Sequence, residues 1–228
     1  MSWDPIWDDV FRQRQWGMYP SEALIRFMAH HFYGRDARRR ADVRVLELGC
    51  GPGANQWYLA REGFSPHGFD GSAVAIARAR ERLEREGLEA DLRVATLADA
   101  ESQALYDAAS FDVVLDVACL QCVPLEQAQR AVRWAHGRLR EPSGRMFSCL
   151  VAAGSWGDGE GVEVAPRTYA RAERGPYAGI GLNRFYTLDE VRALYRDFAA
   201  VTIEQTSRTV QGMGERYVTW IVDASVAK

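Results

Sequence analysis

A short apolar segment that runs into a cluster of alternate glycines constrains this chain more than any other feature. Residues 43–48 read VRVLEL, Gly49, Gly51 and Gly53 follow, and a helix-like segment begins at Ala54. An apolar run bounded by glycines predicts a buried strand. Glycine lets the backbone turn tightly and approach a ligand without a Cβ in the way, and the first N–H groups of a helix are free to bind it. The sequence therefore predicts a strand, a turn and a helix that together hold a ligand.

The alternation of strand and helix continues along the chain. Pattern and length predict further strands at 64–69, 92–95, 111–117, 144–151, 201–209 and 215–222, and helices at 54–62, 73–86, 125–140 and 187–196. Repeated β-α units predict a Rossmann-like, doubly wound α/β fold with a mostly parallel seven-stranded sheet. The last two strands are expected as an antiparallel pair joined at 211–214. Ligands of such sheets bind beyond the carboxyl ends of the strands.

Length and charge exclude several classes of protein. The 228 residues suit one domain, expected to span 1–228. The formal net charge of −3 gives no large positive field, so we expect no nucleic-acid partner. No run of apolar residues is long enough to predict a membrane span. The N-terminus has early acids and no apolar segment of a secretory signal, which favours a cytoplasmic protein.

The four cysteines are expected to be reduced. Cys50, Cys119, Cys122 and Cys149 lie in apolar or glycine-rich segments, as is typical of buried thiols in a cytoplasmic protein. Cys119 and Cys122 form a Cys-x-x-Cys pair, but no second pair and no nearby histidine accompany them. We therefore predict structural thiols and no metal site.

An acid ends the second predicted strand. Asp70 comes 23 residues after Glu47, the acid of the first strand, and is followed by Gly71 and Ser72. A carboxylate at this place can bind both hydroxyls of a ribose. It can also cap the next helix or form an Asx turn, and the sequence leaves both interpretations open.

These motifs resemble the class I S-adenosylmethionine-dependent methyltransferases of small-molecule type. The resemblance rests on residues 47–53 (ELGCGPG), on Asp70, and on 111–117 (FDVVLDV), which resembles the fourth-strand motif of that family. It covers residues 43–151 and extends more weakly to the helix and strand pair at 187–224. It implies S-adenosylmethionine as the cofactor and S-adenosylhomocysteine as the product.

The resemblance also implies roles for single residues. Gly49 and Gly51 would lie against the methionine part of the cofactor, Glu47 would orient its amino group and the loop, and Asp70 would bind the ribose. Asp116 and the next residue would border the sulfonium and the substrate pocket. The complete expected cofactor site consists of Tyr19, Glu47, Gly49, Cys50, Gly51, Asn55, Asp70, Gly71, Ser72, Leu97, Asp99, Asp116 and Val117.

Two regions depart from the family pattern. The family often has an acid just after the third strand that reaches the adenine amino group. Asp99 is the candidate here, with a solvated loop acid as the alternative, and Leu97 is expected against the adenine face. Many small-molecule members carry a histidine beyond the fourth strand, whereas residues 120–124 read LQCVP, so the general base stays unassigned.

Two other functions remain open from the sequence. An NAD(P)-dependent oxidoreductase would need Gly-x-Gly-x-x-Gly, but here the third glycine comes one residue early. Pro52 also removes an N–H donor, and Glu47 would repel a pyrophosphate. A non-catalytic module that binds S-adenosylmethionine is the second alternative.

Three segments are candidates for the acceptor pocket: an N-terminal helical lid at 1–40, residues 119–123, and a substrate-side insertion after the fifth strand at 153–186. The lid contains Tyr19, our single best candidate, and Trp3, Trp7, Phe11 and Trp16; a helix packed on the sheet explains these aromatic residues equally well. Residues 35–40 (RDARRR) are expected as a solvated linker.

The insertion is too long for an ordinary connection and combines arginines with tyrosines. Guanidinium groups beside aromatic rings suit an anionic or aromatic small-molecule acceptor, although surface arginines are the alternative. We expect methyl transfer to an oxygen or nitrogen of such a metabolite by in-line displacement, in a monomer or homodimer. The candidate catalytic residues are Tyr19, Asp116, Arg167 and Tyr169.

Overall fold

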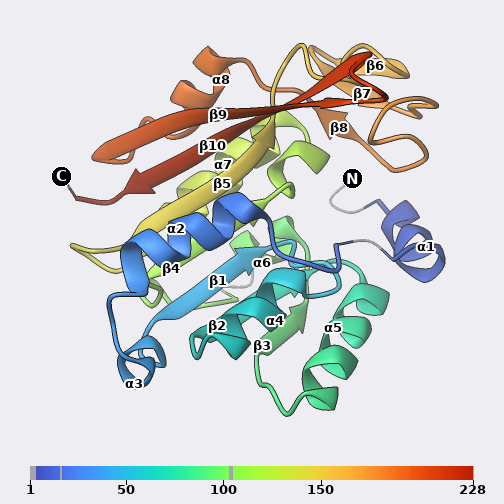
Figure 1. The fold of residues 1–228 in the computed structure, drawn as a ribbon. Coiled ribbons are helices and arrows are strands. Elements are labelled where there is room, and N and C mark those ends of the chain that lie inside the picture. The colour runs from blue at the N-terminus through green and yellow to red at the C-terminus, as the bar shows by residue number, and fades with distance from the viewer. Residues whose placement is uncertain (1–3, 16, 103–104, 228) are drawn as a thin grey trace.

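A computed structural model describes residues 4–15, 17–102 and 105–227. Its centre is a seven-stranded sheet with strand order β3-β2-β1-β4-β5-β10-β9 (Figure 1). The strands are β1 (Arg44–Leu48), β2 (Ser65–Asp70), β3 (Asp91–Val94), β4 (Val113–Val117), β5 (Arg145–Val151), β9 (Ala200–Val210) and β10 (Glu215–Ser225). The first five are parallel, and β10 is antiparallel to β5 and to β9. The predicted α/β fold, with a mostly parallel sheet of seven strands, is confirmed.

The helices are α1 (Ile6–Gln13), α2 (Glu22–Phe32), α3 (Ala37–Arg40), α4 (Ala54–Arg61), α5 (Ala73–Arg85), α6 (Leu97–Ser102), α7 (Leu125–His136) and α8 (Leu188–Leu194), with a 3-10 turn, η1 (Leu120–Cys122), after β4. Helices α2, α3, α5 and α8 each begin after a residue whose side chain caps them. The hydroxyls of Ser72 and Thr187 accept backbone hydrogen bonds at the start of α5 and α8. Glu190 returns the bond to Thr187, which completes the predicted capping box.

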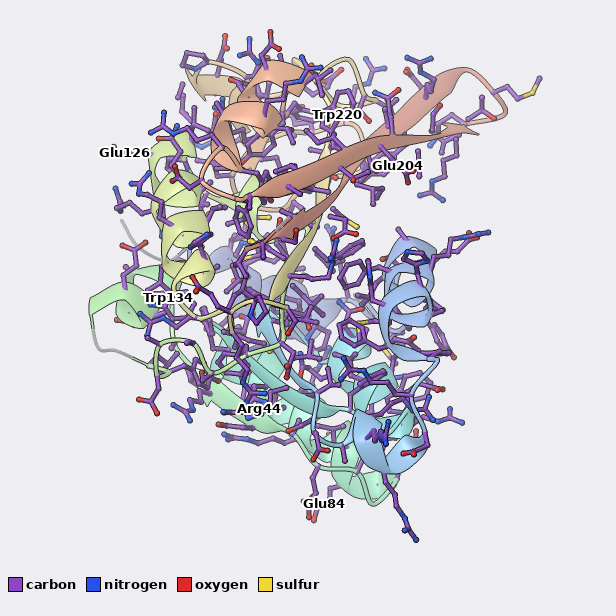
Figure 2. The ribbon with its side chains drawn as sticks, turned by 90° about the vertical axis from the view of Figure 1, so that its left-hand side faces the viewer. Arg44, Glu84, Glu126, Trp134, Glu204 and Trp220 are labelled. Carbon is purple, nitrogen blue, oxygen red and sulfur yellow. The ribbon has the colours of Figure 1, made fainter. Side chains whose placement is uncertain are left out.

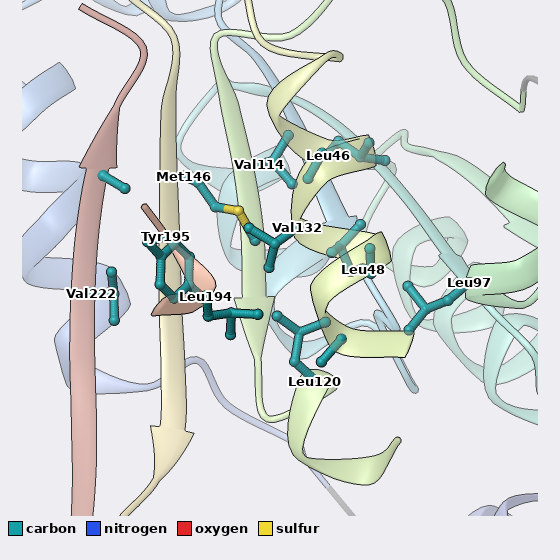
Figure 3. Close-up of a cluster of buried hydrophobic side chains, with 14 of the residues drawn as sticks. Leu46, Leu48, Leu97, Val114, Leu120, Val132, Met146, Leu194, Tyr195 and Val222 are labelled. Carbon is teal, nitrogen blue, oxygen red and sulfur yellow. The ribbon is translucent and has the colours of Figure 1, made fainter. Parts of the chain in front are cut away.

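Helices cover both faces of the sheet. Leu46 of β1 and Val114 of β4 lie in a buried cluster with residues of α6, α7 and α8, part of which Figure 3 shows. Their neighbours Val45 and Val113 lie in a second cluster, with residues of α2 and α4, on the other face. Side chains alternate between faces along a strand, so burial of both faces accounts for the continuous apolar runs in the sequence.

Two further parts lie beyond the carboxyl ends of the strands. In the insertion, β6 (Val162–Ala165), β7 (Thr168–Ala170) and β8 (Asn183–Arg184) form a small antiparallel sheet. Helix α1 stands apart from the layer that α2 forms and lies beside α5 (Figure 1). The N-terminal segment and the insertion therefore flank the side of the sheet where a ligand is expected.

The structure differs from the sequence-based expectation in two short segments. The expectation of a loop at 35–40 is wrong in part, because α3 forms there with Asp36 as its cap. The helix α6 was not predicted, although Thr96 and Asp99 hydrogen-bond reciprocally at its start. Within the described residues, no helix is both long enough and apolar enough to span a membrane.

Candidate cofactor and acceptor site

The turn after β1 consists of glycines in the left-handed region. Gly49, Gly51 and Gly53 have φ angles of 61°, 51° and 79°. A Cβ on Gly49 would lie 2.5 Å from the Cys119 sulfur, and one on Gly53 would lie 2.7 Å from the Cβ of Ala79. Neither distance is sterically acceptable, so these glycines allow the turn to pack between the loop after β4 and helix α5.

Glu47 connects β1 to the helix that follows the turn. Its side chain is buried, and its two oxygens accept hydrogen bonds from the amides of Asn55 (2.6 Å) and Gln56 (2.8 Å). Burial raises the pKa of Glu47 to about 8, although both amides favour the charged form. Glu47 and Asn55 thus fix the first turn of α4, which agrees with the expected role in orienting the loop; contact with the amino group of the cofactor stays a prediction.

Asp70 ties the ends of β1 and β2 together. Its Oδ2 accepts a hydrogen bond from the N–H of Gly51 (2.9 Å), and its Oδ1 accepts one from the N–H of Ser72 (2.8 Å). Burial raises the pKa of Asp70 to about 6, and these two bonds oppose that shift. The bond to Ser72 forms the Asx turn that the sequence left open. Each carboxylate oxygen keeps a second lone pair, so ribose binding remains available.

Asp116 lies at the end of β4, as the sequence predicts, and its place beside the sulfonium stays a prediction. It is fully buried at the end of β4, and its Oδ1 accepts hydrogen bonds from the N–H groups of Cys119 and Leu120, both at 2.9 Å. Its Oδ2 is buried without a hydrogen-bond partner among the described residues. Burial raises the pKa of Asp116 to about 7. Asp116 therefore shapes the turn after β4, and Val117, half-buried at the strand end, lies closer to solvent.

Helix α1 covers the glycine turn. The ring of Phe11 lies 3.6 Å from the position of a Cβ on Gly51, and Asp8 accepts a hydrogen bond from the hydroxyl of Ser72. Arg78 of α5 donates to the backbone oxygens of Arg12 (3.1 Å) and Arg14 (3.2 Å). The N-terminal segment is therefore fastened to the same elements that carry the expected cofactor site.

Other expected cofactor residues have structural explanations. Asp99 accepts hydrogen bonds from the N–H (2.9 Å) and hydroxyl (2.8 Å) of Thr96, which lower its pKa and begin α6. Leu97 is part of the main buried cluster. Cys50 is buried within the glycine turn, and Gly71 is half-buried between Asp70 and Ser72.

Tyr19 does not join this group. Its side chain is 76% exposed, its ring contacts Trp57 edge-to-face at 6.2 Å, and the Arg82 guanidinium lies 5.9 Å from its centre. The structure therefore offers no support for Tyr19 in cofactor binding or catalysis. Trp3 and Trp16, also expected in the lid, lie outside the described residues.

Comparison with known proteins identifies the part of the chain that contains the glycine turn, Asp70 and Asp116. The model of the methyltransferase domain family matches residues 45–144, which begin in β1 and end before β5. Residues 45–144 thus match a methyltransferase domain, and the fold around them is shared with S-adenosylmethionine-dependent methyltransferases of known structure. S-adenosylmethionine is the cofactor of this domain, so the oxidoreductase interpretation is set aside.

Relatives extend the comparison. The ubiquinone biosynthesis O-methyltransferase of Nitrosococcus oceani is 33% identical over 115 residues, 50% of this chain and 46% of the relative. The 23S rRNA (uracil(1939)-C(5))-methyltransferase RlmD of Xanthomonas campestris is 33% identical over 138 residues, 56% of this chain and 31% of the relative. The match thus covers less than half the length of either curated relative.

A solved structure covers more of the chain. The 1,6-didemethyltoxoflavin-N1-methyltransferase of Burkholderia thailandensis, solved with its namesake compound and S-adenosylhomocysteine, has a TM-score of 0.63 and 22% identity. The similarity covers 95% of this chain and 81% of that one. At this level of identity the similarity concerns the fold.

The buried acids of the methyltransferase domain fit the charge of its cofactor. Among the described residues, no basic side chain forms an ion pair with Glu47, Asp70 or Asp116, and burial raises the pKa of all three. The donor carries a sulfonium and an ammonium group, and a nearby positive charge favours an ionised carboxylate. A cofactor bound beside these acids would supply a positive charge that the described side chains do not.

The insertion does not present its arginines as expected. Arg167 donates to Glu190 of α8 from its Nη2 (2.6 Å) and its Nε (3.4 Å). Arg184, only 2% exposed, binds the same carboxylate at 2.5 Å as well as the hydroxyl of Thr168. The expectation of Arg167 as a catalytic residue loses its basis, because the pair of arginines is engaged in holding the insertion to α8.

Aromatic side chains of the insertion gather near α1 instead. Tyr177, Ile180 and Phe185 form a buried cluster with Val10 of α1 and Val151 of β5, and Trp7, Tyr169 and Tyr217 pack against it. The Tyr169 ring contacts Phe185 edge-to-face at 5.9 Å, and burial raises its pKa. Tyr169 is therefore the one expected catalytic candidate that the structure places at the acceptor side.

Gln121 falls within the candidate acceptor segment 119–123, but the sequence assigns it no role of its own. It lies in η1, is 2% exposed, and accepts a hydrogen bond from the N–H of Val151 through its Oε1 (3.0 Å). Its Nε2 is buried without a hydrogen-bond partner of ordinary geometry among the described residues. That amide is nevertheless near enough to lower the pKa of Tyr177, against the larger effect of burial. A polar residue inside an otherwise apolar turn was the available clue.

Metal chemistry finds no support in the side chains that are described. No group of three or more His, Cys, Asp and Glu residues in the described ranges is arranged to hold a metal ion. All four cysteines are free thiols. Burial raises the pKa of Cys119 and Cys149, so both thiols are neutral near pH 7.

Proposed function

We propose that this protein transfers the methyl group of S-adenosylmethionine to an oxygen or nitrogen atom of a small, planar, largely uncharged acceptor. The observation that best supports this proposal is the buried aromatic cluster of Tyr177, Phe185 and their neighbours. Aromatic side chains bind flat rings by stacking and edge contacts. The names of the ubiquinone and toxoflavin relatives, which include an O- and an N-methyltransferase, support the same class of acceptor.

Contacts along η1 connect this cluster to the cofactor turn. Cys119, at the start of η1, packs against Gly49, and Gln121, two residues later, contacts the end of β5. The acceptor would therefore approach from the cluster while the sulfonium lies above the glycine turn. Most of the catalytic effect then comes from alignment of the acceptor atom with the methyl group and from exclusion of water.

The charge of the site favours a neutral acceptor over an anionic one. Arg167 and Arg184 are both engaged by the single carboxylate of Glu190, and Arg174 lies 3.8 Å from Glu160. The three buried acids of the cofactor side would repel a second anion. The same acids, with the net charge of −3, disfavour a polyanion, so we do not extend the RNA substrate named for RlmD to this chain.

Gln121 is proposed to orient the acceptor. The N–H of Val151 fixes its oxygen, so its amide Nε2 can donate a hydrogen bond to an acceptor oxygen or ring nitrogen. An amide takes no proton, so Gln121 positions the acceptor and does not act as a base. Tyr169 is the remaining candidate for a hydroxyl in contact with the acceptor.

Helix α1 is proposed as the lid of the site. It touches the glycine turn through Phe11 and the aromatic cluster through Val10. Both binding partners would enter when α1 moves away, and its return would exclude water. A cytoplasmic location stays a prediction, with which the four free thiols agree.

The test combines turnover with binding. We expect S-adenosylhomocysteine to be released when the protein and S-adenosylmethionine are mixed with pools of neutral aromatic metabolites. Asp70→Ala should weaken cofactor binding in titration calorimetry by about 1.5–3 kcal/mol, the range for charged hydrogen bonds. Asp99→Ala is the matched control, and its affinity should stay within about threefold, or ~0.6 kcal/mol, because Asp99 caps α6.

The outcomes separate the possibilities. Unchanged affinity in Asp70→Ala would overturn the ribose assignment. Cofactor binding without turnover on any acceptor would indicate a non-catalytic binding module. Preferential turnover of carboxylated rings over their neutral amides would contradict the proposed acceptor class.

A further inference from the structure

Strand β9 is a long open edge of the central sheet. It pairs with β10 on one side and ends the sheet on the other, and nine of its eleven residues are exposed. Its register with β10 is unbroken from Ala200 to Val210. The hydrogen bonds between described residues leave its outer side open. Proteins usually protect such edges with proline, lysine or a bulge, and β9 has none of these.

The charges of β9 are placed for pairing with a copy of itself. Glu204 and Arg208 are its only charged residues, and because they are four apart in a strand they lie on the same face. Both are exposed, and neither forms an ion pair with a described residue. The guanidinium carbon of Arg208 lies 5.3 Å from the ring centre of Tyr217, the residue opposite it on β10. The Arg208 side chain therefore packs on β10.

Symmetry restricts the register of such a pair. A two-fold axis perpendicular to the sheet keeps every side chain on its own face. The axis therefore lies level with one residue of β9, and this residue stands opposite the same residue of the second copy. An axis at Thr206 sets Glu204 opposite Arg208 of the second copy, and Arg208 opposite Glu204, which gives two cross-strand ion pairs. An axis at Glu204 or at Arg208 would instead set like charges against each other.

We propose that β9 pairs antiparallel with β9 of a second copy, centred on Thr206, and joins the two central sheets in a two-fold dimer. The pairing edge lies three strands away from β4, so it leaves the cofactor turn open. It also supports β10, which holds the acceptor side through a bond from Ala152 to Val218 (3.0 Å) and through the Tyr177–Tyr217 hydroxyl pair (2.6 Å).

Charge reversal tests the pairing. Sedimentation equilibrium of the full chain should give twice the chain mass of 25.6 kDa, falling on dilution. Glu204→Arg and Arg208→Glu should each raise the dimer dissociation constant by about tenfold or more, since each replaces two attractive pairs by two repulsive ones. The double reversal Glu204→Arg/Arg208→Glu should restore the original value.

A matched control excludes a general effect of charge. Glu84→Arg makes the same change on exposed Glu84 of α5, far from Glu204 (Figure 2), and should leave the dissociation constant unchanged. Circular dichroism and thermal unfolding should be the same for all variants, since every substituted side chain is exposed. A monomer at the highest soluble concentration would overturn the proposal, as would a dimer that the single reversals leave intact.

Cross-linking tests the register independently. Thr206→Cys places two thiols opposite each other at the axis and should give a covalent dimer on mild oxidation. Thr202→Cys, on the same face of β9 but opposite Val210 of the second copy, should not. Equal cross-linking of the two variants, after subtraction of the wild-type background, would overturn the proposed centre.

Discussion

The cofactor side and the acceptor side of this protein are held together in different ways. On the cofactor side, Glu47 binds Asn55, eight residues away, and Asp70 binds Ser72 and Gly51, two and 19 residues away. On the acceptor side, the bonds join distant segments: Arg167 to Glu190, Tyr177 to Tyr217, and Gln121 to Val151.

This difference shows what each side requires. On the cofactor side, hydrogen bonds between segments that follow one another along the chain suffice to form a turn of fixed shape. The acceptor side depends on an insertion that only long-range contacts can place. Damage to these contacts should therefore affect stability and the acceptor side together, whereas damage to the turn should affect the cofactor first.

The largest expected effect is at Glu190. Glu190→Gln removes the negative charge that Arg167 and the almost fully buried Arg184 share as their ion-pair partner. An unpaired buried charge typically costs about 3–5 kcal/mol, so urea unfolding should show a loss of about 3 kcal/mol. Asp189→Asn is the control, because its pair with Arg192 is exposed and should change stability by less than about 0.5 kcal/mol. Equal effects of the two substitutions would refute the assigned role of Glu190.

The next effect is at the glycine turn, where two matched substitutions separate crowding from backbone strain. Gly49→Ala and Gly51→Ala both place a side chain at positive φ, which costs about 1–2 kcal/mol. Only Gly49→Ala also collides with Cys119, so its total loss in urea unfolding should be about 2–4 kcal/mol.

Adding Cys119→Ala to Gly49→Ala should recover the excess, because it removes the sulfur that the new Cβ meets. The Cβ of Cys119 would remain close, at 2.9 Å, so recovery should be partial. No recovery at all would show that backbone strain alone decides the cost of Gly49→Ala.

The pH dependence of stability should be intermediate in size. Burial raises the pKa of Glu47 from 4.5 to about 8, so between these values the folded state binds more protons than the unfolded state. The free energy of unfolding should therefore fall as pH rises through this window, with Glu47 as one contributor. Glu47→Gln should flatten the curve, and saturating S-adenosylmethionine should do so in the wild type. A free energy of unfolding that rises from pH 5 to 8 in both the wild type and Glu47→Gln would contradict this prediction.

The smallest effect should come from the lid residue that the sequence favoured. Tyr19→Ala removes an exposed ring from Trp57 and Arg82, and cofactor affinity measured by calorimetry should change by less than about 0.5 kcal/mol. Phe11→Ala, which removes the ring over Gly51, is the comparison and should have the greater effect. A larger loss of cofactor affinity in Tyr19→Ala than in Phe11→Ala would indicate that Tyr19 belongs to the cofactor site.

Most of the fold and part of the site were predictable. The caps at Ser72 and Thr187, the apolar strands and the antiparallel final pair all follow from short patterns, because capping and alternation act over a few residues. The turn at Gly49 and Gly51 and its bond to Asp70 follow from short patterns as well, and their contact with the cofactor stays a prediction. Asp116, Arg167 and Tyr19 were assigned from position or residue type, and their actual partners could not be inferred without the packing around them.

The sequence by itself determined the succession of strands and helices, the glycine turn and the acids that accompany it, since these features depend on neighbours along the chain and on the burial of both sheet faces. Only the tertiary structure decided that Glu190 pairs with the arginines of the insertion, that Gln121 faces the aromatic cluster and that α1 covers the turn. Such contacts join residues from separate elements, and their free energy exists only once those elements have packed.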